Sequence, residues 1–379
     1  MDLHARYPGL DDLRKRAKQR LPHFAWEYLD SGTGVDAART RNRTALDRIG
    51  FLPGILHGIK EPDLNCNILG EDMALPFGVA PVGMSGLFWP GAEQMLARAA
   101  AAAQIPYTLS TVASQSPEDV APALGPHAWF QLYPPKEEAM RLDMLERIKA
   151  AGFRVLVLTV DVPVASRRER QVRSGLQQPP RLTPRIMAQV AIRPAWALAS
   201  ARRGMPKLRT LEKYVPGPQK AMPPGGHIGY LLRASPDLDY VKWLRDRWDG
   251  PLVIKGVMRV EDTEPLQAAG VDALWVSNHG GRQFDGTPAS IEVLPDIRAA
   301  SNLPVIFDSG IEGGLDVIRA LSLGADFVML GRAFHYAVAA LGAAGPAHLI
   351  DMFRQDISSC LGQMGVPDLS EIPAPIRLD

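Results

Sequence analysis

The chain has 379 residues, long enough for one large α/β barrel or two ordinary domains, and its composition excludes a disordered or collagen-like protein. Its formal net charge of +1 gives no global electrostatic reason to expect nucleic acid as a partner. The two cysteines, Cys66 and Cys360, are too few for a disulfide framework or a metal cluster, and they suit a reducing compartment.

Residues 1–72 predict a helical extension followed by loops. The N-terminus lacks the pattern of a signal peptide, and no apolar run reaches the length of about 18 residues that a membrane span needs, so we expect a cytoplasmic protein. Residues 9–30 favour helices interrupted at Pro22, and residues 31–72 are rich in glycine and proline. Trp26 belongs to an apolar set that fits core packing or the mouth of a barrel.

From residue 76 onward, a rhythm of strand and helix predicts eight short apolar strands. They are expected at 77–82, 106–111, 128–133, 154–162, 252–257, 273–278, 304–309 and 327–331. Eight such strands, most of them followed by a helical pattern, are typical of a (β/α)8 TIM barrel. We therefore expect an α/β protein with one domain over residues 1–379 and its barrel at about 76–345.

The long interval between the fourth and fifth strands predicts an insertion at about 174–226. Within it, residues 181–213 hold eight Lys or Arg against the single acid Glu212, a local charge of +7. Apolar residues such as Trp196 and Leu198 are interleaved with these charges, as expected of a segment on an anionic membrane surface. Because Pro184 and Pro194 prevent one continuous helix, a mobile lid is the alternative.

The strand endings carry the candidate chemistry, because barrel enzymes place catalytic groups at the C-terminal ends of their strands. Four ionisable groups stand there: Asp161, Lys255, His279 and Asp308. Asp161 can hold His279 in one tautomer and stabilise the imidazolium formed when a proton is accepted. Arg168 and Arg282 offer bidentate forks for the carboxylate of a substrate.

Other endings suit a phosphorylated cofactor and require no metal. Neutral donors and acceptors fit the polar edge of a planar ring and its sugar-like chain: Ser110, Gln131, Thr159 and Ser277. Residues 310–314 before a helix, together with Gly331 and Arg332, supply N–H groups and a guanidinium where such barrels bind phosphate.

Several motifs resemble the FMN-dependent 2-hydroxy acid oxidase and dehydrogenase family over nearly the whole chain. They are Ser277-Asn278-His279-Gly280-Gly281-Arg282-Gln283, Gln131-Leu132-Tyr133, Thr159-Val160-Asp161-Val162-Pro163 with Arg167-Arg168-Glu169, Ile254-Lys255-Gly256, and Asp308-Ser309-Gly310. The resemblance implies oxidation of an L-2-hydroxy acid, lactate-like or larger, to the 2-oxo acid with reduction of FMN. It also implies a homotetramer.

The resemblance further implies a role for each site residue. His279 would be the proton acceptor, Asp161 its partner and Tyr133 a hydrogen-bond donor to substrate oxygen, while Arg168 and Arg282 hold the carboxylate. FMN would be bound by Ser110, Gln131, Thr159, Lys255 and Ser277, with the turn Pro81-Val82-Gly83 behind the flavin. Its phosphate would lie near Asp308, Ser309, Gly310, Gly331 and Arg332.

Three positions depart from the pattern of the family. Trp26 stands where a tyrosine or phenylalanine is common at the substrate mouth, and Val112 where glycolate oxidase carries a tryptophan. Glu312 replaces an arginine that helps to hold the phosphate, and its carboxylate would repel that group. We therefore expect FMN to be retained with reduced affinity.

A prediction about the electron acceptor comes from the basic insertion, which resembles the segment that attaches mandelate dehydrogenase to membrane. This favours a dehydrogenase, peripheral on the inner face of the cell membrane, that passes electrons to a quinone or another carrier. The alternatives are an oxidase that forms hydrogen peroxide and a catalytically idle flavin-binding module at the membrane surface. A different FMN reaction, as in type 2 isopentenyl diphosphate isomerase, is disfavoured by the paired arginines and His279.

Overall fold

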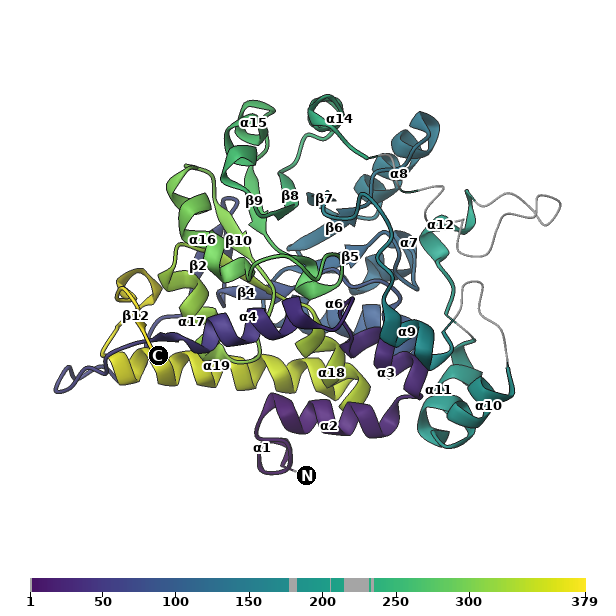
Figure 1. Cartoon of the computed structure of the whole chain (residues 1–379), viewed down its shortest axis with the longest axis horizontal. Helices are drawn as coiled ribbons and strands as arrows, with labels where there is room; N and C mark the ends of the chain where they lie inside the picture. Colours follow the sequence, from purple (N-terminus) through teal and green to yellow (C-terminus); the bar gives the residue numbers. More distant parts are fainter. Residues whose placement is uncertain (1, 177–182, 205, 215–231, 233–234) are drawn as a thin grey trace.

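A closed barrel of eight parallel strands forms the centre of the computed structural model, which describes residues 2–176, 183–204, 206–214, 232 and 235–379 (Figure 1). All eight predicted strands are present, in the order β10-β11-β4-β5-β6-β7-β8-β9 around the barrel. Their bounds are Phe77–Val79 (β4), Tyr107–Ser110 (β5), Ala128–Leu132 (β6), Val155–Thr159 (β7), Leu252–Val257 (β8), Ala273–Val276 (β9), Val305–Phe307 (β10) and Phe327–Leu330 (β11). The predicted TIM barrel is confirmed.

Along each strand, alternate side chains point into the barrel. Those deep in the interior are apolar, and those at the C-terminal ends are polar. Trp129, Val157, Val253 and Trp275 belong to one buried cluster inside the barrel. Because successive side chains on a strand point to opposite faces, the residue two positions later returns to the interior. Those residues, nearer the C-terminal end, are Gln131, Thr159, Lys255 and Ser277. The period of the strands therefore brings a ring of polar side chains to the barrel mouth.

The opposite end of the barrel is closed by a short hairpin. Strands β2 (Cys66–Ile68) and β3 (Glu71–Met73) pair antiparallel, and their buried residues Ile68 and Met73 join the interior cluster. A second small sheet joins β1 (Ile49–Gly50) to β12 (Ile376–Arg377) near the C-terminus. The one end of the barrel left for a ligand is the C-terminal mouth.

Helices surround the barrel and extend below it in Figure 1. The barrel helices are α5 (Ser85–Phe88), α6 (Ala92–Ala102), α7 (Pro117–Val120), α8 (Glu138–Ala150), α9 (Glu169–Ser174), α14 (Leu238–Arg245), α15 (Thr263–Ala268), α16 (Ser290–Ala299), α17 (Gly314–Ser322), α18 (Arg332–Leu341) and α19 (Ala344–Met364). The predicted N-terminal extension consists of α1 (Leu3–Arg6), α2 (Leu10–Arg20), α3 (His23–Asp30) and α4 (Ala37–Asp47). The predicted interruption at Pro22 separates α2 from α3.

Besides α9 and α14, the described residues between β7 and β8 form the helices α10 (Pro184–Ala191), α11 (Pro194–Arg203) and α12 (Arg209–Glu212). Of the predicted insertion at 174–226, residues 177–182, 205 and 215–226 lie outside the described residues, and Arg181 is among them. Pro184 and Pro194 each occupy the first turn of a helix, which explains why the segment forms two short helices. Among the described residues, no helix combines the length and apolar character needed to cross a membrane.

Candidate active site

A cavity of about 380 Å³ opens at the C-terminal mouth of the barrel and collects most of the predicted site. It is lined by the ends of several strands and by residues from α2 and α3. The predicted residues along its wall are Pro81, Val82, Gly83, Ser110, Tyr133, Arg168, Lys255, His279, Arg282, Asp308, Ser309, Gly310, Gly331 and Arg332. Residues from distant parts of the sequence therefore meet in one place.

His279 is oriented by Asp161, which lies behind it. Its Nδ1 is 3.0 Å from Oδ1 of Asp161, and its backbone N–H donates to Oγ of Ser277 over 3.0 Å. The approach of Asp161 requires Gly256, because a Cβ at that position would lie 2.6 Å from Cβ of Asp161. His279 itself has φ of 57°, a left-handed conformation that is strained for a residue other than glycine.

The protonation of this pair suits proton acceptance at His279. Burial lowers the pKa of His279 below its ordinary value, although Asp161 opposes that effect. Burial alone would raise the pKa of Asp161, but His279 and Lys255 bring it below its ordinary value. A carboxylate accepts a hydrogen bond only from a protonated nitrogen, so Nδ1 carries the proton and Nε2 is the nitrogen available to a ligand.

Two half-buried guanidinium groups, those of Arg282 and Arg332, line the cavity close together. Arg282 donates from Nη1 to the carbonyl oxygen of Ser31 over 2.9 Å, and Arg332 donates from Nη2 to the same carbonyl over 3.1 Å. Burial, followed by the charges of Arg168 and Arg332, lowers the pKa of Arg282 to about 9. An anionic ligand would relieve this repulsion. The cavity is therefore electrostatically prepared for a carboxylate or a phosphate.

The polar ring below the mouth has the donors and acceptors that a flavin ring needs. Nε2 of Gln131 and Oγ1 of Thr159 are buried with no hydrogen-bond partner within the described part of the chain. Buried polar groups are normally paired, so these two atoms indicate a polar ligand. Lys255 donates to Oγ of Ser277 over 2.6 Å and lies 2.9 Å from Oδ2 of Asp308, which places a cation beside them. These residues fit FMN.

At the end of the cavity predicted to bind phosphate, two backbone N–H groups have partners within the protein. The N–H of Gly314 donates to Oδ2 of Asp356 over 2.5 Å, and the N–H of Glu312 donates to Asp316 over 2.9 Å. These two N–H groups are therefore paired with carboxylates within the protein, and the predicted phosphate site depends on the other residues of this turn and on Gly331 and Arg332. Glu312 lines the cavity with its side chain 39% exposed, and it lies 3.9 Å from Nη1 of Arg14.

Trp26 does not line the cavity, whereas Tyr28 does. Trp26 is buried and stacks on Tyr336 with ring centroids 5.8 Å apart, a position that does not fit the expected role at the substrate mouth. Residues two apart on a helix project about 200° from one another, so a core tryptophan at one position directs the other side chain elsewhere. Tyr28 lies 5.4 Å below the guanidinium of Arg282. That helical offset was the signal in the sequence that could have identified it.

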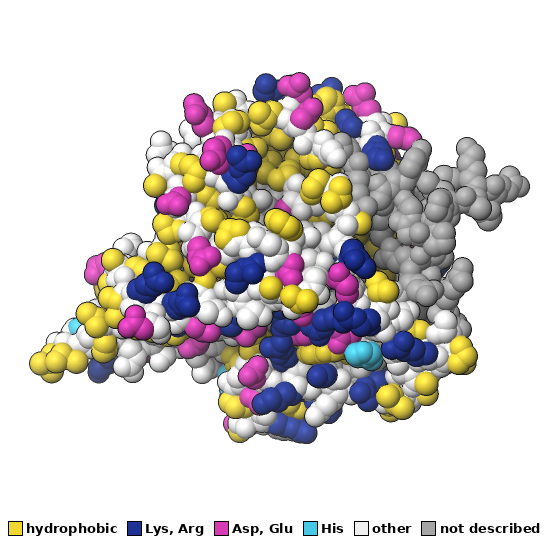
Figure 2. Space-filling view, viewed as in Figure 1, with side chains coloured by type: hydrophobic (Ala, Val, Ile, Leu, Met, Phe, Trp, Pro, Cys, Tyr) yellow, Lys and Arg dark blue, Asp and Glu magenta, His cyan; other side chains and the backbone are white. Residues whose placement is uncertain are grey.

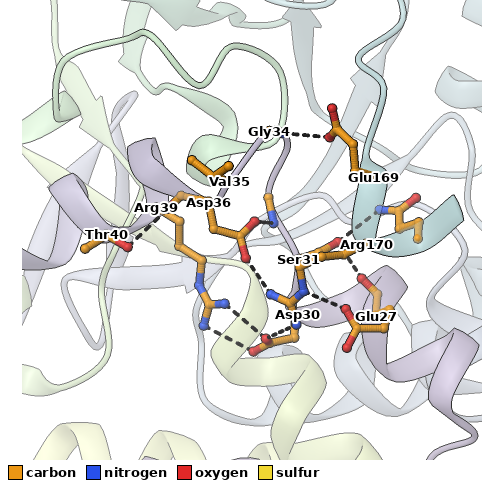
Figure 3. A network of polar contacts seen from close by, with 12 residues as sticks. Glu27, Asp30, Ser31, Gly34, Val35, Asp36, Arg39, Thr40, Glu169 and Arg170 are labelled. Atoms are coloured by element: carbon orange, nitrogen blue, oxygen red, sulfur yellow. Dashed lines mark hydrogen bonds and ion pairs between the residues drawn. The ribbon is translucent and has the colours of Figure 1, made fainter. Parts of the chain in front are cut away.

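The carbonyl oxygens that receive Arg282 and Arg332 belong to the end of α3, which a network of charges fixes in place (Figure 3). The carboxylate of Asp30 receives Arg39 at 3.0 Å, Arg170 at 3.1 Å and the hydroxyl of Tyr336 at 2.8 Å. These partners come from α4, α9 and α18. The N-terminal extension is thereby joined to the barrel at the cavity.

Comparison with known sequences gives matches along almost the whole chain. The profile of the FMN-dependent dehydrogenase family matches residues 17–377. An L-lactate dehydrogenase of Vibrio cholerae is 39% identical over 364 residues, which cover 95% of this chain and 96% of the relative. An L-lactate dehydrogenase of Pseudomonas aeruginosa is 39% identical over 366 residues, with 96% of each chain covered.

Solved structures also match along almost the whole chain. A crystal structure of the monotopic membrane protein (S)-mandelate dehydrogenase superposes with a TM-score of 0.92 and 32% identity, and it covers 98% of this chain and 99% of its own. A putative lactate oxidase of Pediococcus acidilactici superposes with a TM-score of 0.84 and 28% identity, with 98% of this chain and 95% of that chain covered.

Proposed function

The chain belongs to the FMN-dependent dehydrogenase family, oxidoreductases that act on 2-hydroxy acids, and we propose that His279 is the proton acceptor in its oxidation of an L-2-hydroxy acid to the 2-oxo acid. The observation that carries this proposal is the neutral imidazole of His279, oriented by ionised Asp161 and placed in one cavity with Arg168 and Arg282. When bound, FMN accepts the two electrons of the oxidation.

Each residue of the chain has a defined task in this reaction. Arg168 and Arg282 bind the carboxylate of the acid, which pairs their charges. Burial and the charge of Asp161 raise the pKa of Tyr133, so its hydroxyl stays protonated and donates to an oxygen of the substrate. Nε2 of His279 accepts either the hydroxyl proton or the C2 proton, according to whether C2 loses a hydride or is deprotonated first. Asp161 then stabilises the imidazolium.

The FMN would be held by the polar ring and by the two turns at the cavity wall. We assign Ser110, Gln131, Thr159, Lys255 and Ser277 to the flavin and its ribityl chain. The turn of Pro81, Val82 and Gly83 would contact the flavin, and Asp308, Ser309, Gly310, Gly331 and Arg332 would surround the phosphate. The unpartnered donors of Gln131 and Thr159 support the first assignment.

The apolar part of the cavity supports an acid with a hydrocarbon side chain, lactate-like or larger. The apolar residues that line it include Met84, Phe88, Val112, Leu176, Leu208 and Leu232. Leu176 and Leu208 lie within the insertion at 174–226, so the insertion contributes to the wall of the cavity. Burial of apolar surface favours larger side chains by about 0.8 kcal/mol for each CH₂ group.

Anaerobic mixing of the FMN-loaded protein with a panel of L- and D-2-hydroxy acids tests this function. We expect L acids with apolar side chains to bleach the visible absorbance of the flavin, and D acids to leave it unchanged. If no acid of either hand bleached the flavin, the proposed function would be wrong.

We propose that α10 and α11 attach the enzyme to an anionic membrane surface, where a quinone or another carrier reoxidises it. Ile186 and Trp196 anchor the two helices, and Nε1 of Trp196 donates to the carbonyl of Leu87 over 2.9 Å. The segment 184–203 also exposes apolar and basic residues together, including Met187, Ile192, Leu198 and Arg202. Figure 2 shows these two kinds of side chain mixed at the lower right, over α10 and α11.

Co-sedimentation with vesicles tests the attachment. The protein should bind vesicles that contain phosphatidylglycerol at low salt and be released by salt, and the variant Ile192→Asp/Leu198→Asp should bind more weakly. Binding equal to that of neutral vesicles would refute the proposal. The oxidase alternative predicts stoichiometric hydrogen peroxide in air instead of slow reoxidation.

We also propose that the enzyme is a homotetramer. Support comes from the segment 51–62, which projects from the molecule at the lower left of Figure 1 and exposes Leu52, Ile55 and Leu56. Exposed apolar clusters of this kind mark interfaces between proteins. Light scattering should give four times the mass of one chain, and a monomeric mass would contradict the proposal.

A further inference from the structure

Ser85 and His335 form a buried polar pair beside the cavity that the proposed reaction does not use. Ser85 begins α5 and His335 lies in the first turns of α18, and their side chains are almost inaccessible to solvent. Oγ of Ser85 is 2.8 Å from Nε2 of His335. Nδ1 of His335 is 2.8 Å from the carbonyl oxygen of Gly331, and Oγ of Ser85 is 3.0 Å from the carbonyl oxygen of Val82.

These contacts determine where the protons lie. A carbonyl oxygen only accepts, so Nδ1 of His335 carries the proton and donates to Gly331. Burial lowers the pKa of His335 to about 4, so Nε2 has no proton at neutral pH and accepts from Ser85. The single hydroxyl proton of Ser85 is shared between Nε2 and the carbonyl of Val82. The pair is thus a hydrogen-bonded chain from Val82 to Gly331.

Both ends of this chain are backbone positions in the cavity wall. Val82 belongs to the turn assigned to the flavin, and Gly331 precedes Arg332 in the turn assigned to the phosphate. The ring of His335 also meets the ring of Phe88 edge-on, with centroids 5.3 Å apart, and Phe88 lines the cavity. A shift of either turn would break at least one of these contacts.

We propose that His335 and Ser85 are positioning residues for FMN, which hold the turn at 81–83 and the turn at 331–332 at the separation that the cofactor requires. The inference rests on the assignment of those two turns in the proposed function. It adds a physical link between the two ends of the cofactor site, made by side chains that do not themselves line the cavity.

Titration of the apoprotein with FMN, followed by quenching of flavin fluorescence, tests the proposal. His335→Leu and Ser85→Ala should each weaken FMN binding by about tenfold, because a broken buried hydrogen bond frees one turn. The double variant should bind no more weakly than His335→Leu alone, since both substitutions break the same chain. His335→Asn keeps a donor near the position of Nδ1 and should recover part of the affinity.

His348→Leu is the matched control. His348 is also buried and bonds a backbone carbonyl, that of Tyr7 at 2.9 Å, but it does not line the cavity and its partner is far in the chain from both turns. It should leave FMN affinity and the flavin reduction potential unchanged, whereas His335→Leu should shift both. The proposal is overturned if His335→Leu binds FMN within about twofold of the unchanged protein, or if His348→Leu weakens binding equally. Either result is independent of whether a hydroxy acid bleaches the flavin.

Discussion

At the scale of single residues, the half-buried His279 and the buried His335 differ in what contacts their second ring nitrogen, and this difference separates a catalytic from a positioning role. Burial lowers the pKa of both His279 and His335. Nδ1 of each is occupied, by Asp161 in one case and by the carbonyl of Gly331 in the other. Nε2 of His335 is taken by Ser85, whereas His279 lines the cavity with Nε2 available. His279 is therefore the histidine placed to accept a proton from a ligand.

Glu312 gives a prediction at the same scale. Its carboxylate lies at the assigned phosphate end of the cavity, so Glu312→Arg should replace repulsion with attraction and tighten FMN binding by about three- to tenfold at low salt. Fluorescence titration of the apoprotein at low and high salt measures the change, which should shrink as salt screens the charges. Glu371→Arg, an exposed position outside the cavity wall, is the control. Equal affinities for both variants and the unchanged protein would contradict this account of Glu312.

At the scale of elements, the C-terminal end of α3 forms part of the cavity wall. Its carbonyl oxygens receive Arg282 and Arg332, and the side chain of Asp30 between them is bound to α2, α4, α9 and α18. The charges of Arg39 and Arg14 overcome the effect of burial and lower the pKa of Asp30. The N-terminal extension therefore contributes both stability and the orientation of two arginines.

Replacement of Asp30 tests that contribution. Asp30→Asn should lower the free energy of unfolding of the apoprotein by about 3–5 kcal/mol, because it removes the buried negative charge that Arg14, Arg39 and Arg170 share. Arg14→Gln removes a partly exposed partner from the same carboxylate and should cost no more than about 1 kcal/mol. Urea denaturation measures both. Similar losses for the two variants would mean that the network is not centred on Asp30.

At the scale of the whole molecule, the sequence was sufficient for the barrel and for most of its mouth. Strand ends such as Thr159 and Ser277 could be placed because a period of two and the geometry of a barrel leave few alternatives. Two contacts could not be placed from the sequence: the hydrogen bond from Arg282 to the carbonyl of Ser31 and the hydrogen bond from the N–H of Gly314 to Asp356. Both involve backbone atoms that any residue carries. The sequence left Trp26 open between core packing and the barrel mouth, because the helical face of α3 depends on the packing of α18.

The stability of the whole apoprotein should depend on pH through His335. Its pKa is lowered from the usual 6.5 to about 4, so the unfolded chain binds the proton more readily. The neutral state of His335 contributes its full stabilisation of the folded protein, about 3 kcal/mol, at pH values above the pKa of the unfolded chain. This stabilisation is lost as the pH falls toward 4. His279 acts in the same direction, so His335→Leu should reduce the slope without abolishing it. Urea denaturation between about pH 7 and pH 5 measures the slope, and an unchanged slope in His335→Leu would contradict the buried neutral state.

The most direct test of the central claim is the rate at which an L-2-hydroxy acid reduces the bound flavin in His279→Gln, measured by anaerobic stopped-flow absorbance. Glutamine keeps the size and polarity of the side chain but accepts no proton. The variant should retain FMN and bind the acid, while flavin reduction slows by about a thousandfold or more. Reduction within about tenfold of the unchanged enzyme would show that His279 is not the proton acceptor.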